Sequence, residues 1–298
     1  MPRVLIHVSI NIRNALVEKF RQKLRDFNKL HGMNVKIVIP ENNHEESWLS
    51  EGQPQSSFPD MALSHATDFV SLSRKKQKEV FMSLPERFPM REELREKGLL
   101  DPDDLLHTAF LVPFVIVCNA RLVPPAERPV DWKGLMKAKW RNKVTFPHPK
   151  TPITQAVLAF LKNSYPKEFE EFYSSIKFQN SPVEVVKSVG DGLFPLGIAN
   201  TTFAKTVEQR NVIRIWPAEG ILCIPQVVVY KQGADQRLLE LGDFLFDREV
   251  QEMIARQGFI PVNSEISLPQ GILEKMRQFP WAGWEHYFAM LDRLRKVS

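Results

Sequence analysis

Two long apolar runs rich in β-branched residues constrain this fold more than any other part of the sequence. They cover residues 111–119 and 221–230. Nearly unbroken runs of this kind are typical of strands buried on both faces of an α/β sheet. Each run contains a proline, Pro113 or Pro225, and a proline removes one backbone donor from a sheet. We therefore expect a bend at each proline, where the chain crosses between two lobes.

The expected fold is a two-lobed α/β protein in which each lobe is a mostly parallel sheet flanked by helices and two hinge strands join the lobes. A chain of 298 residues is long enough for about two domains. With the crossings near the two prolines, lobe 1 is expected to contain residues 1–113 and 222–298. Lobe 2 is expected to contain residues 114–221.

The opening of the chain places polar residues at the end of a strand. Residues 4–10 are expected to form a strand, residues 14–30 a helix and residues 35–39 a second, parallel strand. Ser9 and Asn11 lie where the first strand passes into the helix. Open α/β sheets bind ligands at the carboxyl ends of their strands. These side chains are therefore either ligand donors or caps of the helix.

A second strand end in lobe 1 follows the short apolar segment 61–63. It carries His65, Thr67 and Asp68. His65 and Thr67 are candidates for contact with a ligand. A histidine close to a carboxylate also makes His65 and Asp68 a candidate metal site, and the alternative is a structural histidine held by hydrogen bonds.

Lobe 2 offers five candidate ligand residues. Thr151 and Thr154 open a helix, whose free N–H groups and hydroxyls suit an anion, although the same hydroxyls also suit helix capping. Asn200 and Thr201 follow the apolar segment 195–199, and Glu219 precedes the second long run. Hydroxyls, amides and helix starts favour a small oxyanion, or a metal ion held together with an anion. The sequence does not decide between a metal ion and an oxyanion as the bound ligand.

Charge gives little sign of a nucleic-acid partner. The formal charge is +5, with 40 basic residues spread among 35 acidic ones. The densest basic cluster, residues 74–78, has no interleaved aromatic residues and is expected to be the solvated start of a helix. No nucleic-acid partner is expected.

The sequence has no export signal and no apolar stretch near the ~18 residues of a membrane span. The expected location is the cytoplasm for the chain as written, or the periplasm or exterior for a trimmed mature form. Cys118 and Cys223 lie one in each long run, without a CxxC motif. They are expected to be buried thiols, or a disulfide in an oxidising compartment.

Motifs of the common enzyme classes are missing from the sequence. It has no GxSxG, HExxH, P-loop or GxGxxG motif. Ser64 and His65 are adjacent, which is poor support for a catalytic dyad because such pairs usually come from separate segments. We expect a binding protein rather than an enzyme.

Four motifs, in this order along the chain, resemble a known family. They are residues 140–144 (WRNKV), 190–199, 216–220 (WPAEG) and 247–263. Together they are similar to the extracellular solute-binding proteins of ABC importers, in the ferric-iron-type branch of the type II periplasmic-binding-protein fold. The resemblance implies two lobes that close on a small ligand by hinge motion, and an ABC permease as a partner.

The sequence departs from this branch in one important place. Iron-binding members carry adjacent tyrosines in the region that here reads Asn200-Thr201-Thr202-Phe203, where neither tyrosine is present. Tyrosinate coordination of ferric iron is therefore not expected. The alternative functions are an intracellular ligand-sensing module of the same fold and, with less support, an enzyme.

Overall fold

The two proline-containing runs form strands β4 (His107–Asn119) and β9 (Leu222–Tyr230), as the sequence predicts. The computed structural model describes residues 1–40, 48–206 and 211–296. The chain divides into unit 1, Met1–Leu111 with Pro225–Leu268, and unit 2, Val112–Ile224 with Pro269–Ser298. Each of the two long strands therefore contributes to both units.

The two prolines lie at the points where these strands change partners. In unit 1, β4 pairs with β10 (Ile260–Pro261) through Phe110 and Leu111, and in unit 2 it pairs with β7 (Leu196–Asn200) from Phe114 onward. Pro113 falls between these two ladders, where its missing N–H breaks neither of them. Pro225 similarly precedes the part of β9 that pairs with β3 (Met61–His65).

The sheet of unit 1 has the order β2-β1-β3-β9. Its first strands are β1 (Arg3–Ile6) and β2 (Lys36–Val38). Strand β1 runs parallel to both β2 and β3, which confirms the parallel pairing predicted for the opening of the chain. Strand β9 runs antiparallel to β3.

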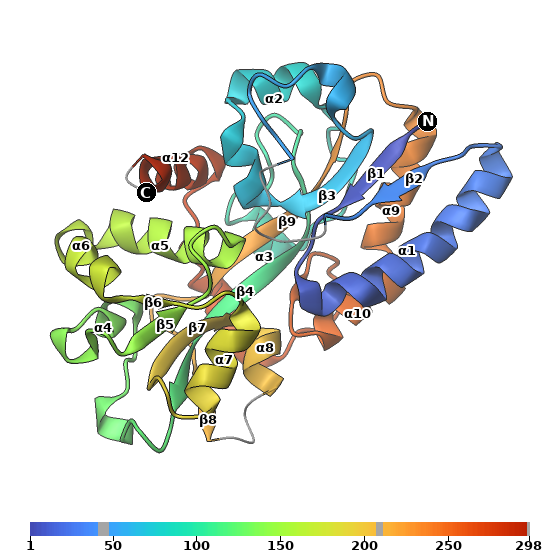
Figure 1. The fold of residues 1–298 in the computed structure, drawn as a ribbon. Coiled ribbons are helices and arrows are strands. Elements are labelled where there is room, and N and C mark those ends of the chain that lie inside the picture. The colour runs from blue at the N-terminus through green and yellow to red at the C-terminus, as the bar shows by residue number, and fades with distance from the viewer. Residues whose placement is uncertain (41–47, 207–210, 297–298) are drawn as a thin grey trace. The chain divides into compact units, whose positions relative to one another are not determined.

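The helices of unit 1 are α1 (Ile10–His31), α2 (Arg74–Val80), α3 (Glu92–Arg95), α9 (Leu239–Phe246) and α10 (Arg248–Arg256). Helix α1 packs against α9, and α9 packs against α10 (Figure 1). The helix α1 buries an apolar stripe that includes Leu16 and Phe20, and it ends at Gly32 with a left-handed φ of 59°.

The boundary between β1 and α1 differs from the prediction. The strand ends at Ile6 rather than near residue 10, and the helix begins at Ile10 rather than at residue 14. The carbonyl of Ser9 accepts from the N–H groups of Ile12 and Arg13. The buried Ile12 extends the apolar stripe of the helix by one turn, so burial favours the earlier start.

The sheet of unit 2 has the order β4-β7-β5-β6, and β8 also pairs with β4. Its remaining strands are β5 (Val144–Phe146), β6 (Lys177–Phe178) and β8 (Val212–Ile215). Strand β7 runs antiparallel to β4 and parallel to β5. The helices of unit 2 are α4 (Trp132–Leu135), α5 (Pro152–Ser164), α6 (Pro166–Ser175), α7 (Pro182–Gly190), α8 (Thr201–Thr206), α11 (Gln270–Arg277) and α12 (Trp284–Arg295).

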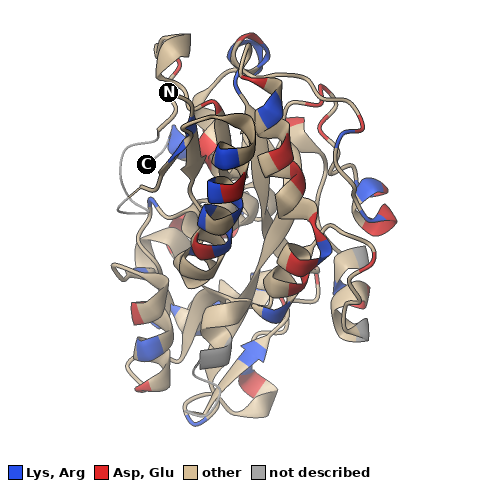
Figure 2. Ribbon diagram, turned by 90° about the vertical axis from the view of Figure 1, so that its right-hand side faces the viewer, with Lys and Arg blue, Asp and Glu red and all other residues tan. Residues whose placement is uncertain are grey.

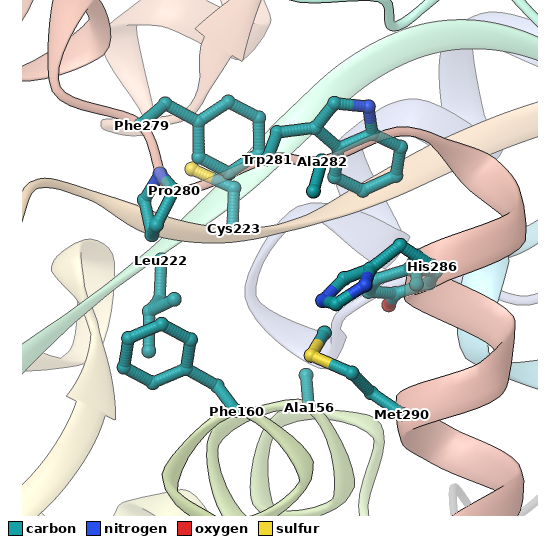
Figure 3. Close-up of a pocket in the computed structure, with 11 residues that line it drawn as sticks. Ala156, Phe160, Leu222, Cys223, Phe279, Pro280, Trp281, Ala282, His286 and Met290 are labelled. Atoms are coloured by element: carbon teal, nitrogen blue, oxygen red, sulfur yellow. The ribbon is translucent and has the colours of Figure 1, made fainter. Parts of the chain in front are cut away.

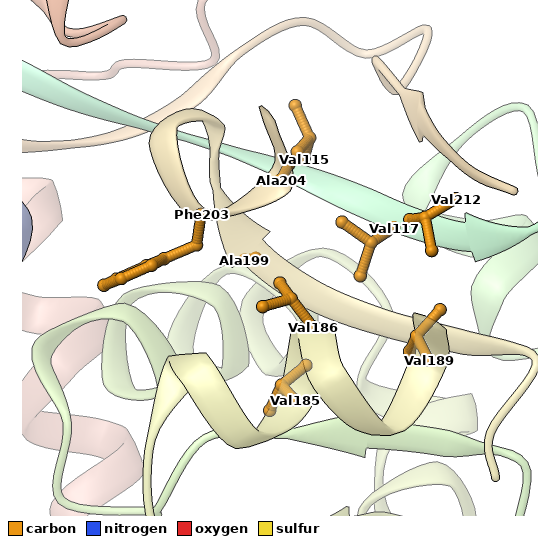
Figure 4. Packing of buried hydrophobic residues seen from close by; sticks show 9 residues of the cluster. All are labelled: Val115, Val117, Val185, Val186, Val189, Ala199, Phe203, Ala204 and Val212. Atoms are coloured by element: carbon orange, nitrogen blue, oxygen red, sulfur yellow. The ribbon is translucent and has the colours of Figure 1, made fainter. Parts of the chain in front are cut away.

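Short aliphatic side chains fill one part of the core of unit 2 (Figure 4). Val117 of β4 lies in the same cluster as Val185 and Val189 of α7. A Cβ atom on Gly197 of β7 would lie 2.8 Å from the side chain of Val185. The glycine therefore lets α7 pack closely on the sheet, because protein cores leave little free volume.

The C-terminal segment lies in a different place from the one expected. The sequence assigned residues 222–298 to lobe 1, whereas in the structure residues 269–298 belong to unit 2, where α12 packs along α5. The turn before β9 also contacts this segment. Gly220 has a φ of 106°, and a Cβ atom on it would lie 1.9 Å from the carbonyl oxygen of Gln278.

The basic cluster at residues 74–78 starts α2 as predicted, and ion pairs engage part of it. Arg74 pairs with Asp101 and Asp103, and Lys78 also pairs with Asp103. On the face shown in Figure 2, Lys and Arg alternate with Asp and Glu along the helices. Among the described residues, no helix combines the length and apolar character that crossing a bilayer requires.

Replacing Gly220 with alanine tests the contact with the C-terminal segment. Gly220→Ala should lower the free energy of unfolding by about 3 kcal/mol or more, because overpacking adds to the cost of a left-handed φ. Gly233→Ala is the matched control, since Gly233 has a φ of 77° but no atom within 4 Å of the added Cβ. It should cost only about 1 kcal/mol. Equal losses of unfolding free energy in the two variants, measured by urea denaturation, would show that the contact with Gln278 is unimportant.

Candidate functional site

Polar side chains, most of them buried, gather at the carboxyl ends of β1 and β3 in unit 1. This group, the polar cluster, consists of His7, Trp48, Ser64, His65, Asp68 and Gln226. His7 directly follows β1, and Ser64 and His65 end β3. Because β1 and β3 are parallel neighbours, their carboxyl ends lie at the same edge of the sheet.

Asp68 is the centre of the polar cluster. Its Oδ2 atom lies 2.8 Å from Nδ1 of His7, accepts from the Ser64 hydroxyl, and is 3.4 Å from the donor Nε1 of Trp48. Burial tends to raise the pKa of the Asp68 carboxyl, but the interactions with His7, His65 and Ser64 outweigh it and lower the pKa to about 2. Asp68 is therefore an ionised carboxylate at neutral pH, and its side chain is 14% exposed.

His65 is a neutral side chain in the same cluster. It is only 3% exposed, and its ring meets the ring of His7 edge-on with 4.9 Å between centroids. Burial, followed by the electrostatic influence of His7, lowers the pKa of His65 to about 3, although Asp68 acts in the opposite direction. Its Nδ1 atom accepts a hydrogen bond from the side-chain amide of Gln226.

Nε2 of His65 and Oε1 of Gln226 are buried polar atoms of the cluster that have no hydrogen-bond partner within the described part of the chain. Because Nδ1 of His65 accepts from an amide N–H, the ring proton resides on Nε2, which is therefore a donor. One unused donor and one unused acceptor thus lie on adjacent side chains.

The predicted pairing of His65 with Asp68 as metal ligands is not the arrangement seen. The carboxylate of Asp68 bonds to His7, and Nδ1 of His65 bonds to the side-chain amide of Gln226, so coordination of a metal by His65 and Asp68 stays a prediction. Among residues 1–40, 48–206 and 211–296, no group of three or more His, Cys, Asp or Glu side chains is arranged to hold a metal ion. The geometry of the polar cluster favours an oxygen-bearing ligand.

Sequence reasoning missed His7, Trp48 and Gln226. His7 lies only two residues before the predicted Ser9, so its position beside the first strand end was an available signal. Gln226 is different, because it is the residue opposite His65 in the antiparallel register of β3 and β9. Only that pairing brings the two side chains together.

The other predicted residues of unit 1 lie in the adjoining turns. Ser9 begins α1 without a hydrogen bond from its side chain to the helix. Asn11 lies in the first turn of α1, and both polar atoms of its side chain are buried without a partner in the described residues. Thr67 is buried in the turn after β3. The capping role considered for Ser9 is thus not seen.

Thr151 and Thr154 in unit 2 use their hydroxyls within their own turn. Thr151 accepts from the N–H of Thr154 and donates to the carbonyl of His148 over 2.8 Å. The Thr154 hydroxyl lies 2.9 Å from that of Thr151 and donates to the carbonyl of Pro147. The hydroxyls therefore play the capping role at the start of α5.

Asn200 and Thr201 mark the passage from β7 into α8. The side-chain oxygen of Asn200 accepts from the N–H of Phe203 over 3.1 Å, which caps the first turn of α8. Asn200 and Thr201 are both buried. Like Thr151, Asn200 uses its side chain to bind a backbone N–H group in the first turn of the helix that follows it.

Glu219 stabilises the start of α4 and contacts Tyr165. Its carboxylate accepts from the N–H of Trp132 over 3.0 Å and from that of Lys133 over 3.4 Å. The Tyr165 hydroxyl donates to the same carboxylate over 2.8 Å. Burial, followed by this hydrogen bond, raises the pKa of Tyr165 well above its usual value.

An apolar pocket of unit 2 contains none of the predicted ligand residues. Figure 3 shows Phe160 of α5, Trp281 and Met290 of the C-terminal segment and Cys223 of β9 around it. Cys118 and Cys223 are both free and buried. Burial raises the pKa of Cys118 to about 11 and that of Cys223 well above its usual value, so both remain thiols at neutral pH.

The neutral state of His65 predicts a loss of stability in acid. The pKa of His65 is near 3 in the folded protein and near 6.5 in the unfolded chain. The contribution of His65 to the free energy of unfolding is therefore complete above pH 6.5 and declines as the pH falls toward 3. In urea denaturation of ligand-free protein, His65 should make the free energy of unfolding fall by about 1.4 kcal/mol for each unit by which the pH is lowered in this range. His65→Asn should remove that part of the slope. An unchanged slope would mean that His65 takes up a proton in the folded state.

The bond between Glu219 and Tyr165 predicts a spectroscopic change. Glu219→Gln should lower the pKa of Tyr165, because both a charge and a charged acceptor are lost, and should cost about 2 kcal/mol of stability. Tyrosinate absorbance during alkaline titration reports the shift, and Tyr165→Phe assigns it. Glu168→Gln is the comparison variant, because Glu168 acts on Tyr165 through its charge alone and forms no hydrogen bond with it, so its shift should be the smaller one. An equal shift in both variants would contradict the assignment.

Solved structures with the same fold include three bacterial proteins. Iron-bound HitA from Pseudomonas aeruginosa has a TM-score of 0.76 at 12% identity, covering 99% of this chain and 98% of that one. The ferric binding protein from Campylobacter jejuni has a TM-score of 0.73 at 13% identity, covering 100% and 98%. An ABC transporter protein from Clostridium perfringens has a TM-score of 0.68 at 17% identity, covering 99% and 98%.

These likenesses show a shared fold, and they confirm the predicted type II α/β class. No curated protein matches this chain in sequence. Residues 56–287 match the family of bacterial extracellular solute-binding proteins, and they make up more than half of the chain. The chain therefore belongs to the bacterial extracellular solute-binding protein family.

Proposed function

We propose that this solute-binding protein captures a small oxyanion that carries a proton, such as hydrogen carbonate or hydrogen phosphate, and delivers it to an ABC-type permease outside the cytoplasm. Membership of an extracellular solute-binding family supports the transport role. The likeness to an ABC transporter protein from Clostridium perfringens agrees with it. The polar cluster of unit 1 supports the class of solute.

The unpartnered atoms of His65 and Gln226 are the observation that carries this proposal. Both residues are at least 97% buried, and leaving a buried polar atom unpaired costs about 1–3 kcal/mol. A ligand that pairs with both atoms would recover that cost. The position of the pair, at the carboxyl end of β3, is where open α/β sheets bind ligands.

The donor and acceptor pattern selects the chemistry of the ligand. Nε2–H of His65 requires an oxygen acceptor, and Oε1 of Gln226 requires an O–H or N–H donor. A protonated oxyanion offers both groups on neighbouring oxygens. A bare cation could contact Gln226 but would be repelled by the Nε2–H of His65. A metal ion therefore fits this cluster only when an oxyanion accompanies it.

The iron-binding alternative rests on relatives that are described as iron-bound or ferric-binding. In this chain, Asn200 lies in the region where the resemblance places two adjacent tyrosines, and its side chain caps α8. We therefore propose an oxyanion, rather than iron, as the ligand. Closure of two lobes on the ligand, as expected from the sequence, stays a prediction.

Catalysis has no support in the geometry of the polar cluster. Ser64 and Asp68 both lie near Nδ1 of His7, at 3.3 and 2.8 Å. A proton relay requires the nucleophile and the carboxylate on opposite ring nitrogens. We infer a binding role for these residues. An intracellular sensing role is not favoured, because the family is extracellular.

Calorimetric titration with potassium hydrogen carbonate and with inorganic phosphate tests the proposal, after native mass spectrometry and elemental analysis of gently purified protein. Gln226→Leu and His65→Asn should each weaken binding of the preferred anion at least tenfold, because each removes one of the two pairing atoms. Gln226→Leu should leave stability nearly unchanged, since it also removes an unpaired buried atom.

Gln77→Leu is the matched control for Gln226→Leu. Gln77 is equally buried in unit 1, but its amide donates to the carbonyls of Phe69 and Leu72. It should therefore lose about 1–3 kcal/mol of stability and keep its anion affinity. Full anion affinity in both cluster variants, or a stoichiometric metal bound without any anion, would overturn the proposal.

A further inference from the structure

One direct contact joins Gln226 to the ring of His65. The two residues lie opposite each other in the antiparallel register of β3 and β9, and the side-chain amide of Gln226 donates to Nδ1 of His65. Gln226 is fully buried and His65 is 3% exposed, so bulk water does not compete for this hydrogen bond. A neutral imidazole carries its proton on the nitrogen that is not the acceptor, which in His65 is Nε2.

His7 provides a contrast within the same cluster. Its Nδ1 atom lies 2.8 Å from Oδ2 of Asp68 and 3.3 Å from the hydroxyl of Ser64, which itself donates to Asp68. An ionised carboxylate only accepts hydrogen bonds, so Nδ1 of His7 carries a proton. The centroids of the two histidine rings are 4.9 Å apart. Nδ1 is therefore protonated in His7 and not in its neighbour, because one faces a carboxylate and the other faces an amide N–H.

The state of Nε2 decides which ligand His65 can meet. This atom is buried and has no partner among the described residues. With its proton, Nε2 donates to an oxygen acceptor. Without a proton, it presents a lone pair, as in histidines that bind a metal ion and donate their other ring N–H to a carboxylate, a carbonyl or water. The amide donor at Nδ1 gives His65 the reverse of that arrangement.

We propose that Gln226 determines the specificity of the polar cluster, because its amide keeps the proton of His65 on Nε2 and so selects a ligand with an oxygen acceptor over a metal ion. A carboxylate of the same shape would accept from Nδ1–H and leave a lone pair on Nε2. Gln226 is a positioning residue in this role, since it acts through His65. The choice between ligand classes rests on the proposed function, whereas the position of the proton does not.

Nitrogen-15 NMR of the histidine rings tests the position of the proton. At about pH 9, well above the usual pKa of histidine, ligand-free protein should show Nε2 protonated in His65 and Nδ1 protonated in His7. The variants His65→Asn and His7→Asn assign the signals. A proton on Nδ1 of His65 in the unmodified protein would overturn the proposal, whether or not any anion binds.

Gln226→Glu reverses the hydrogen bond and keeps the shape of the side chain. The proton of His65 should move to Nδ1, because the new carboxylate accepts where the amide donated. His7 is the control within the same spectrum, since its Nδ1 proton faces Asp68 in both proteins and should stay in place. A proton that remains on Nε2 of His65 in Gln226→Glu would contradict the role of Gln226.

Zinc titrations detect the lone pair that the reversed bond leaves on Nε2. Gln226→Glu should bind Zn²⁺ about tenfold or more tightly than the unmodified protein, because a carboxylate on the other ring nitrogen supports a metal-binding histidine. Adding His65→Asn to Gln226→Glu should remove this gain. A gain that persists in the double variant would mean that the new carboxylate alone attracts the metal, and selection through His65 would be wrong.

The proposed function and the role of Gln226 fail in different ways. If neither hydrogen carbonate nor phosphate binds, but the proton of His65 moves and zinc affinity rises in Gln226→Glu, the anion proposal is lost and the role of Gln226 stands. If an anion binds and Gln226→Leu weakens it, but the proton of His65 does not respond to Gln226→Glu, the anion proposal stands and selection by Gln226 is overturned.

Discussion

Backbone pairing of β4 and β9 is the constraint on which the rest of the structure depends. Both strands are long and buried, so their N–H and C=O groups must find partners in the sheet. The prolines are tolerated because Pro113 and Pro225 lie outside the ladders that the strands form with β10, β7 and β3. The antiparallel register of β9 on β3 then fixes Gln226 opposite His65, and the polar cluster follows from that register.

Within the cluster, two histidines a few ångströms apart have different surroundings. His7 bonds to the carboxylate of Asp68, whereas His65 bonds to the neutral amide of Gln226. Burial disfavours charge on His65, and the neighbouring His7 adds to that effect. The His7 ring therefore lies beside a carboxylate. The other ring is neutral, and its Nε2 donor has no partner among the described residues, which is the property we expect of a group that binds a ligand.

The candidate residues of unit 2 show how easily caps resemble ligand sites in a sequence. Thr151 and Asn200 stand where a helix begins and accept from its N–H groups, and Glu219, from the turn before β9, accepts from an N–H group at the start of α4. Short polar side chains at such positions satisfy the free N–H groups of the first turn before they meet any ligand. The same residue types in the same pattern therefore serve both roles, and only the observed partners separate them.

The sequence by itself determined the α/β class, the parallel opening of unit 1, the two long proline-containing strands and the resemblance to solute-binding proteins. These features depend on local apolar periodicity, on turn chemistry and on the order of motifs, which are properties of neighbouring residues. His65 and Asp68 were also found in this way, because they follow a strand directly.

Only the tertiary structure decided which of these groups meet. The pairing of Asp68 with His7, the contact of Gln226 with His65 and the packing of α12 on α5 join residues that are between 61 and 161 positions apart or lie in separate segments. Sheet register and the close approach of Gly220 to Gln278 set these contacts, and neither leaves a periodic trace in the sequence. Chain-distant contacts arise from burial of the whole core, so the assignment of the C-terminal helices and the hydrogen-bond partners of each polar residue had to come from the folded chain.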